Sequence, residues 1–167
     1  MVTCDMFNVL HDIMLTVPKN ETKEQIAQII ANGYRARTIP KGFSMIIETL
    51  ANAVKNAPTT NSKIRALQEF KILIWRAANF ETFIGRFQNI AALLVEEVFK
   101  EPMIDILKNA LQILRQMGNY GPEDLQSQLK KDLVPERLIH IRDQPNSDGE
   151  LKQLIDQLLR CLNAIRV

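Results

Sequence analysis

The sequence predicts an all-α protein, an α-solenoid of about three helix pairs plus flanking helices. Apolar residues recur at helical spacing along nearly the whole chain, whereas the period-two alternation of a half-buried strand is hard to find. The run Ala66-Leu67-Gln68 returns 44 residues later as Ala110-Leu111-Gln112, each time inside a helical stretch. Residues 107–117 also match residues 155–165 in apolar pattern, at an offset of 48. Self-similarity at this period predicts a stack of helix pairs.

The repeat length narrows this fold class. An offset of 44 residues falls within the roughly 40–47 residues of HEAT and armadillo units. Because such units present long surfaces to other macromolecules, the pattern favours a binding protein over an enzyme.

The first helices are expected at residues 5–15 and 21–32. Thr3 is a candidate N-cap for the first helix, which ends before Pro18 because a residue that precedes proline avoids the helical region. Asn20 is the candidate N-cap of the second, and Gly33 is placed for a left-handed C-terminal cap.

The middle of the chain predicts helices at residues 43–56 and 62–77, followed by a long helix from Phe80 to about residue 99 that Asn79 caps. The helix at 62–77 is apolar on more than one face, so it needs cover on two sides. Trp75 is expected in the core because its neighbours are apolar.

The last third predicts helices at 103–117, 122–133, 135–142 and 148–166. Gly118 is expected to end the first of these helices, and Ser147 is expected to cap the last. Pairing gives 21–32 with 43–56, 62–77 with 80–99, and 103–117 with 122–133. We expect a single helical-repeat domain over 1–167, with divergent helices at 1–60, the two best HEAT-like units at 61–142 and a closing helix at 147–166.

This pairing would place an aromatic residue near each turn inside a helix pair, on one edge of the stack. The three aromatics are Tyr34, Phe80 and Tyr120. Cationic side chains accompany the first turn, namely Arg35, Arg37 and Lys41. One hypothesis is a contact ridge for a partner protein, since aromatics and arginine supply most interface hot spots. The alternative is that the aromatics fold back onto the preceding helix ends.

Nothing in the sequence points to catalysis, a cofactor or a metal. His11 and His140 lie outside any ligand pattern, and Cys4 and Cys161 are expected to be buried structural thiols. The formal net charge of +2 argues against a dedicated nucleic-acid binder. Neither a signal peptide nor a membrane-spanning stretch is recognisable, so we expect no membrane partner and a cytoplasmic location.

The segment from residue 63 to about 115 resembles a TOG-type HEAT unit, and more narrowly the C-terminal domain of the CLASP (cytoplasmic linker-associated protein) family. In that family, an Ala-Leu-x-x-Leu helix leads through a turn with Phe to a Leu-rich helix with acidic residues, then to a helix with Ala-Leu-x-Val/Ile-Leu-Arg. The matching positions are Ala66, Leu67, Phe80, Phe87, Ile90, Leu93, Leu94, Glu96, Ala110, Leu111, Leu114 and Arg115.

The resemblance implies a module that docks protein partners for a microtubule regulator at the cytoskeleton or spindle, including kinetochores and plus ends. The partner would offer a helix or a short linear motif. Two alternatives stay open. One is direct tubulin binding, although the tubulin-binding domains place a tryptophan in the first turn, where this chain has Tyr34. The other is a helical scaffold protein that self-associates.

Overall fold

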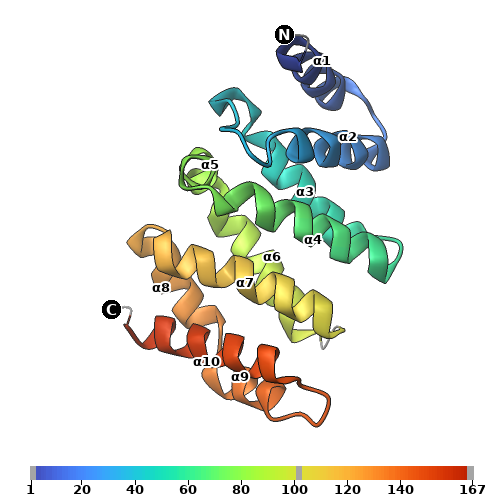
Figure 1. The fold of residues 1–167 in the computed structure, drawn as a ribbon. Coiled ribbons are helices and arrows are strands. Elements are labelled where there is room, and N and C mark those ends of the chain that lie inside the picture. Colours follow the sequence, from blue (N-terminus) through green and yellow to red (C-terminus); the bar gives the residue numbers. More distant parts are fainter. Residues whose placement is uncertain (1–2, 101–102, 165–167) are drawn as a thin grey trace. The chain divides into compact units, whose positions relative to one another are not determined.

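The computed structural model describes residues 3–100 and 103–164, with side chains given from residue 6 onward. Every regular element of these residues is a helix, as the sequence predicts (Figure 1). The chain divides into two compact units, Met1–Phe83 and Ile84–Val167. None of the helices in the described residues is long and apolar enough to span a membrane.

The first unit is a stack of helices in which sequence neighbours are also spatial neighbours. α1 packs on α2, α2 packs on α3 and α4, and α4 also packs on α3 and α5. The bounds are α1 Thr3–Thr16, α2 Asn20–Gly33, the 3-10 turn η1 Lys41–Phe43, α3 Met45–Asn56, α4 Thr60–Trp75 and α5 Ala77–Phe83.

The second unit repeats this plan. α7 packs on α6, α8 and α10, while α10 also packs on α8 and α9. The bounds are η2 Ile84–Arg86, α6 Phe87–Phe99, α7 Ile104–Tyr120, α8 Glu123–Asp132, α9 Pro135–Arg142 and α10 Gly149–Ala164.

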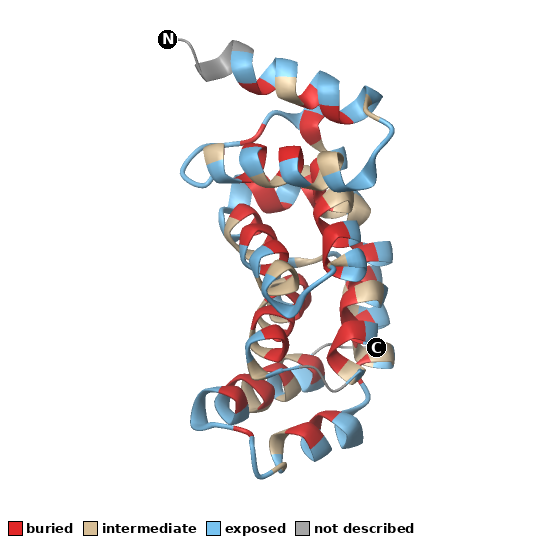
Figure 2. Cartoon of the chain, turned by 90° about the vertical axis from the view of Figure 1, so that its right-hand side faces the viewer, coloured by how far each residue is buried: buried red, intermediate tan, exposed pale blue. Residues whose placement is uncertain are grey.

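The repeated Ala-Leu pair marks the inward face of equivalent helices. Ala66 and Leu67 of α4 are fully buried, and so are Ala110 and Leu111 of α7. Figure 2 shows the same division in both units, with buried positions on the helix faces that meet one another. The Ala-Leu sequence repeat therefore reflects equivalent core positions in α4 and α7.

The predicted helix 80–99 is broken into α5, η2 and α6. Asn79 does not cap it, because Asn79 lies inside α5 and is completely buried. Gly85 sits in the short η2 turn, and glycine inside a helix lowers helix stability. The break therefore falls where the sequence favours the α-helix least.

Other predicted helix ends differ in their chemistry. Thr59 caps α4 by accepting the Ser62 N–H at 3.1 Å, so α4 begins at Thr60, two residues before the predicted start at residue 62. Asn20 is already helical, and Lys19 at the N-cap makes no side-chain cap. Ser147 instead donates to the Ile141 carbonyl at 2.6 Å, and Asp148 caps α10 by accepting the Leu151 N–H at 2.8 Å.

Two glycines serve helix packing and not helix termination. Gly33 is the last residue of α2 and does not adopt the left-handed conformation; the Phe7 ring occupies the space that a Cβ would need. Gly118 lies inside α7, which runs on to Tyr120, and a Cβ there would lie 3.1 Å from the Cys161 sulfur. Both positions allow a close approach between neighbouring helices.

Candidate protein-interaction surface

The loop between α2 and α3 and the end of α4 form one exposed, positively charged edge of the first unit. Arg35 and Arg37 lie in this loop, Lys41 begins η1, and Trp75 and Arg76 lie at the end of α4. All five residues are exposed. We call them the basic turn surface.

Two side chains from the α4–α5 junction hold the loop in place. The Asn79 side-chain oxygen accepts the Ile39 N–H at 2.7 Å, and its amide donates to the Arg37 carbonyl at 3.1 Å. The Arg76 guanidinium donates to the Ala36 carbonyl at 2.9 Å. Three backbone groups of the loop, at Ala36, Arg37 and Ile39, are thereby held next to the end of α4 and the start of α5. The basic turn surface is preorganised, which lowers the entropy that a partner would have to overcome.

The charges of this surface are not neutralised within the described residues. Arg35 donates to the side-chain oxygen of Asn32 at 3.2 Å, which is a neutral partner. Arg37 and Lys41 make no ion pair with a carboxylate in the part of the chain that the structure describes. By contrast, Lys108 in the second unit lies 2.7 Å from Asp148 and 2.6 Å from Glu150. The loop therefore leaves its positive charges exposed to solvent.

Trp75 corrects the prediction that it belongs to the core. Its side chain is 57% exposed at the last residue of α4. The apolar neighbours Leu73 and Ile74 are fully buried, but each residue along a helix turns by about 100°, so Trp75 points away from them. Trp75 is thus a large exposed aromatic that precedes Arg76 in the sequence, and aromatic and arginine side chains are enriched at interface hot spots.

The predicted ridge of three aromatics is wrong for two of its members. Tyr34 and Phe80 are buried, while Tyr120 at the end of α7 is 65% exposed. Tyr34 packs against Phe7 at 5.2 Å and against Phe43 at 5.9 Å between ring centroids. Its ring thus folds back into the first unit, as the alternative in the sequence analysis expected, although Gly33 supplies no left-handed turn.

Arg35, Arg37 and Lys41 are thus exposed on one connecting segment between α2 and α3, while Tyr34, the aromatic predicted beside them, is buried. Sequence reasoning missed Trp75, Arg76 and Asn79. The expected helix already ended near Ala77, so Trp75 lay in its final turn, where one side of a helix often faces solvent. That position was the signal in the sequence.

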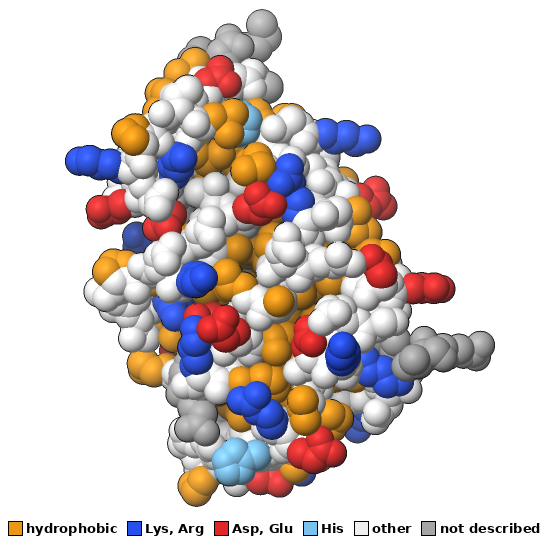
Figure 3. All heavy atoms as spheres, turned by 180° about the vertical axis from the view of Figure 1, so that it is seen from behind, with side chains coloured by type: hydrophobic (Ala, Val, Ile, Leu, Met, Phe, Trp, Pro, Cys, Tyr) orange, Lys and Arg blue, Asp and Glu red, His pale blue; other side chains and the backbone are white. Residues whose placement is uncertain are grey.

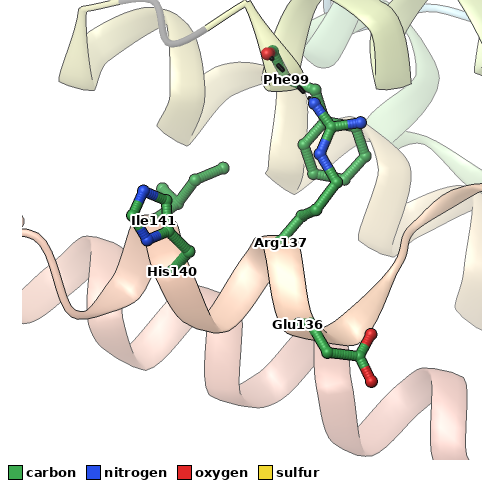
Figure 4. Close-up of a pocket in the computed structure, with 5 residues that line it drawn as sticks. All are labelled: Phe99, Glu136, Arg137, His140 and Ile141. Atoms are coloured by element: carbon green, nitrogen blue, oxygen red, sulfur yellow. Dashed lines mark hydrogen bonds between the residues drawn. The ribbon is translucent and has the colours of Figure 1, made fainter.

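A shallow pocket of about 210 Å³ lies in the second unit between the end of α6 and α9. Figure 4 shows the Arg137 guanidinium lying over the Phe99 ring, 3.8 Å from its centroid, with a hydrogen bond of 3.4 Å to the Phe99 carbonyl. Glu136, His140 and Ile141 complete the lining. Because Arg137 is already committed to Phe99, this pocket lacks a free charged group at its centre.

A polar cleft of about 360 Å³ lies between α2 and α4 in the first unit. Glu21, Glu24, Gln25 and Gln28 of α2 face Arg65 of α4 and the turn before it. Partial burial, and then the neighbouring Glu21 carboxylate, raise the pKa of Glu24. The lining of this cleft combines two carboxylates and one arginine with neutral polar side chains.

The histidines and Cys161 form no predicted functional cluster among the described residues. His11 is buried and stacks on Phe43 at 4.2 Å, and His140 is exposed near Gln144. Cys161 is half-buried, and Cys4 lies outside the residues whose side chains are described. Among the described residues, no cluster of three or more His, Cys, Asp or Glu side chains converges to hold a metal.

Solved structures resemble this chain in fold. An engineered protein matches it with a TM-score of 0.62 at 14% identity, over 92% of this chain and 62% of the other. A designed armadillo repeat protein matches it with a TM-score of 0.61 at 14% identity, over 92% of this chain and 63% of the other. This chain thus spans slightly less than two thirds of their length.

No protein-family model and no curated protein sequence matches the chain. The likeness to the CLASP domain gains no support from the comparisons. What they show is the fold, which is the all-α repeat solenoid of the armadillo and HEAT type.

Proposed function

We propose that this chain is a non-enzymatic docking module that binds an acidic helix or short linear motif through the basic turn surface. The observation that carries this proposal is the set of cationic side chains, Arg35, Arg37 and Lys41, that lack a carboxylate partner within the described residues. Trp75, exposed at the end of α4 next to Arg76, whose guanidinium contacts the same loop, would supply an apolar anchor. Complementary charge would steer the partner and select it, and the aromatic ring would supply much of the affinity.

The armadillo-type fold supports the general role, since helical repeats act chiefly as protein-binding scaffolds. The single-domain organisation over residues 1–167 is part of the proposal; its support is that each comparison covers 92% of the chain. The narrower role, a docking module of a microtubule regulator at plus ends, spindle or kinetochore in the cytoplasm, has as its support the sequence resemblance around Ala66 and Ala110.

Two measurements test the proposal. The first is binding of the purified chain to an array of peptides in which acidic residues flank a single apolar anchor. The second is cosedimentation with taxol-stabilised microtubules, with soluble tubulin on a sizing column as its companion. Arg35→Glu/Arg37→Glu should abolish binding to the acidic peptides.

The matched control is Lys131→Glu/Lys152→Glu, which makes the same change in net charge at exposed positions of the second unit. Retained binding by Arg35→Glu/Arg37→Glu, or equal loss in the control, would contradict a specific basic surface. Microtubule or tubulin binding that depends on Arg35 and Arg37 would support the direct tubulin alternative. If neither microtubules nor tubulin bind while acidic peptides still do, the result would support the docking role and not the tubulin alternative.

A further inference from the structure

The terminal helix α1 carries apolar side chains on two sides. Its inner side is buried against the first unit through Phe7, His11 and Met14. Phe7 contacts Tyr34, and His11 stacks on Phe43. This side alone accounts for how α1 is attached.

A second apolar stripe faces solvent. Met6, Val9 and Ile13 are 49%, 57% and 42% exposed, at the i, i+3, i+7 spacing that aligns side chains along one helix face. Figure 3 shows hydrophobic side chains gathered on the surface at the end formed by α1. We call Met6, Val9 and Ile13 the outer stripe.

α10 of the second unit has a different distribution of exposed side chains from α1. α10 buries Leu151, Leu154, Ile155, Leu158 and Leu162, and its exposed side includes Lys152, Gln153, Arg160 and Asn163. Of the large hydrophobic side chains exposed within the described residues, α1 holds four and α10 holds none. The outer stripe therefore has the composition of a helix face that packs against another helix.

The charges of α1 restrict what can cover the outer stripe. α1 contains Asp5 and Asp12 and no Lys or Arg. The Asp12 side chain is 82% exposed and lies one turn from Val9 and beside Ile13 in sequence. Pairing α1 with α1 of a second copy would bring the exposed Asp12 carboxylates onto one apolar interface, with no Lys or Arg of α1 to balance them. A membrane surface is equally disfavoured, since interfacial helices rely on Lys and Arg to approach anionic lipids.

We propose that the outer stripe docks an amphipathic helix of a partner protein, one with apolar residues at i, i+3/i+4 and i+7 and a row of Lys or Arg beside them. The partner's apolar face would cover Met6, Val9 and Ile13, and its basic row would face Asp12. This surface is separate from the basic turn surface and asks for the opposite charge in its partner. The inference does not depend on the function proposed above.

The test uses two synthetic fluorescent helical peptides that share one Leu/Ile stripe and differ in their flanks, Lys in one and Glu in the other. Fluorescence anisotropy should show the Lys-flanked peptide binding the full chain about tenfold or more tightly than the Glu-flanked peptide. Val9→Gln/Ile13→Gln should abolish binding. Asp12→Lys should reverse the preference between the peptides.

Leu15→Gln is the matched control, because Leu15 is 51% exposed and lies two residues, about 200° around the helix, from Ile13. It should bind like the wild type, and so should Arg35→Glu/Arg37→Glu. All the substituted side chains are exposed, and far-UV circular dichroism checks that each variant is folded. Binding to neither peptide, equal binding to both, or no effect of Val9→Gln/Ile13→Gln would overturn the proposal. A dimer in sedimentation velocity that Val9→Gln/Ile13→Gln dissociates would replace the partner helix by a second copy.

Discussion

Asn79 accepts the backbone N–H of Ile39 at 2.7 Å, so that a buried amide of α5 closes the loop that displays Arg35 and Arg37. The same amide donates to the Arg37 carbonyl. One side chain thus satisfies both a donor and an acceptor of a loop that has no regular hydrogen-bond ladder. This contact links the stability of the first unit to the geometry of the basic turn surface.

Asn79→Ala should destabilise the protein by about 1–3 kcal/mol, because it leaves the buried Ile39 N–H without its partner. Urea unfolding followed by circular dichroism measures this change. The variant should also bind acidic peptides more weakly at a temperature at which it is still folded, since the loop loses its anchor. Arg76→Ala is the comparison, because it removes a single exposed bond to the same loop. If Asn79→Ala lowers the free energy of unfolding no more than Arg76→Ala does, the buried amide does not have a central role in holding the loop.

Gly33→Ala should destabilise the packing of α1 by about 1–3 kcal/mol, because the new methyl group needs the space that the Phe7 ring fills. Gly42→Ala and Gly85→Ala are matched controls, since a Cβ at either position meets nothing within 4 Å. They should be neutral or slightly stabilising. Thermal unfolding of the three variants gives the comparison. Equal midpoints for all three would mean that Phe7 moves aside at no cost.

The sequence predicts the inward faces better than it predicts the ends of the helices. Ala66 and Ala110 lie inside helices, as predicted, because the apolar pattern around them has helical spacing and repeats along the chain. The prediction that Gly33 forms a left-handed helix cap was wrong. Glycine suits both a left-handed cap and a close contact between helices, and only the position of the Phe7 ring shows which of the two applies. Ser147 and Asp148 are both good capping residues, and one position decides which of them meets the first N–H groups of α10.

The basic turn surface was half predictable for a related reason. Arg35 and Arg37 are exposed because charged loop residues usually are. Trp75 was expected in the core and is exposed, while Tyr34 took the buried one of its two predicted arrangements. Each depends on the direction of a single side chain at a helix end, and a shift of one residue there turns it by about 100°. Apolar content near a helix end therefore predicts burial poorly.

Trp75→Ala should separate binding from stability. Because its ring is 57% exposed, the free energy of unfolding should change by about 0.5 kcal/mol or less. Binding of an acidic peptide with an apolar anchor should weaken by about 2 kcal/mol if the indole is the hot spot of the basic turn surface. Peptide titration of wild type and variant, beside their urea unfolding curves, measures both quantities. An unchanged peptide affinity in Trp75→Ala would show that the partner does not bind the indole.

The Cys161 thiol should react slowly with alkylating agents. Burial raises the pKa of Cys161, although Arg115 lowers it in part, so less thiolate is present near pH 8 than in a free cysteine. In a Cys4→Ser variant, iodoacetamide should alkylate the remaining thiol more slowly than it alkylates cysteine in a short peptide, and the rate should keep rising above pH 9. Urea should remove the difference. A rate in the folded protein equal to that of the peptide would show that Gly118 and its neighbours do not shield the sulfur.

The stability of the second unit should depend on pH through Asp148. The hydrogen bond from Lys108 and the N–H of Leu151 hold the pKa of Asp148 below its ordinary value. A lowered folded-state pKa means that the carboxylate stabilises the fold fully above its unfolded-state pKa, near pH 4, and loses this effect as the pH falls further. Asp148→Asn keeps an oxygen that can cap α10 but gives up the ion pair, so its urea midpoint should lie below that of the wild type at pH 7. The gap should close between about pH 4 and pH 2 and shrink in high salt. A gap that persists unchanged at pH 2 would assign the effect of the substitution to packing and not to charge.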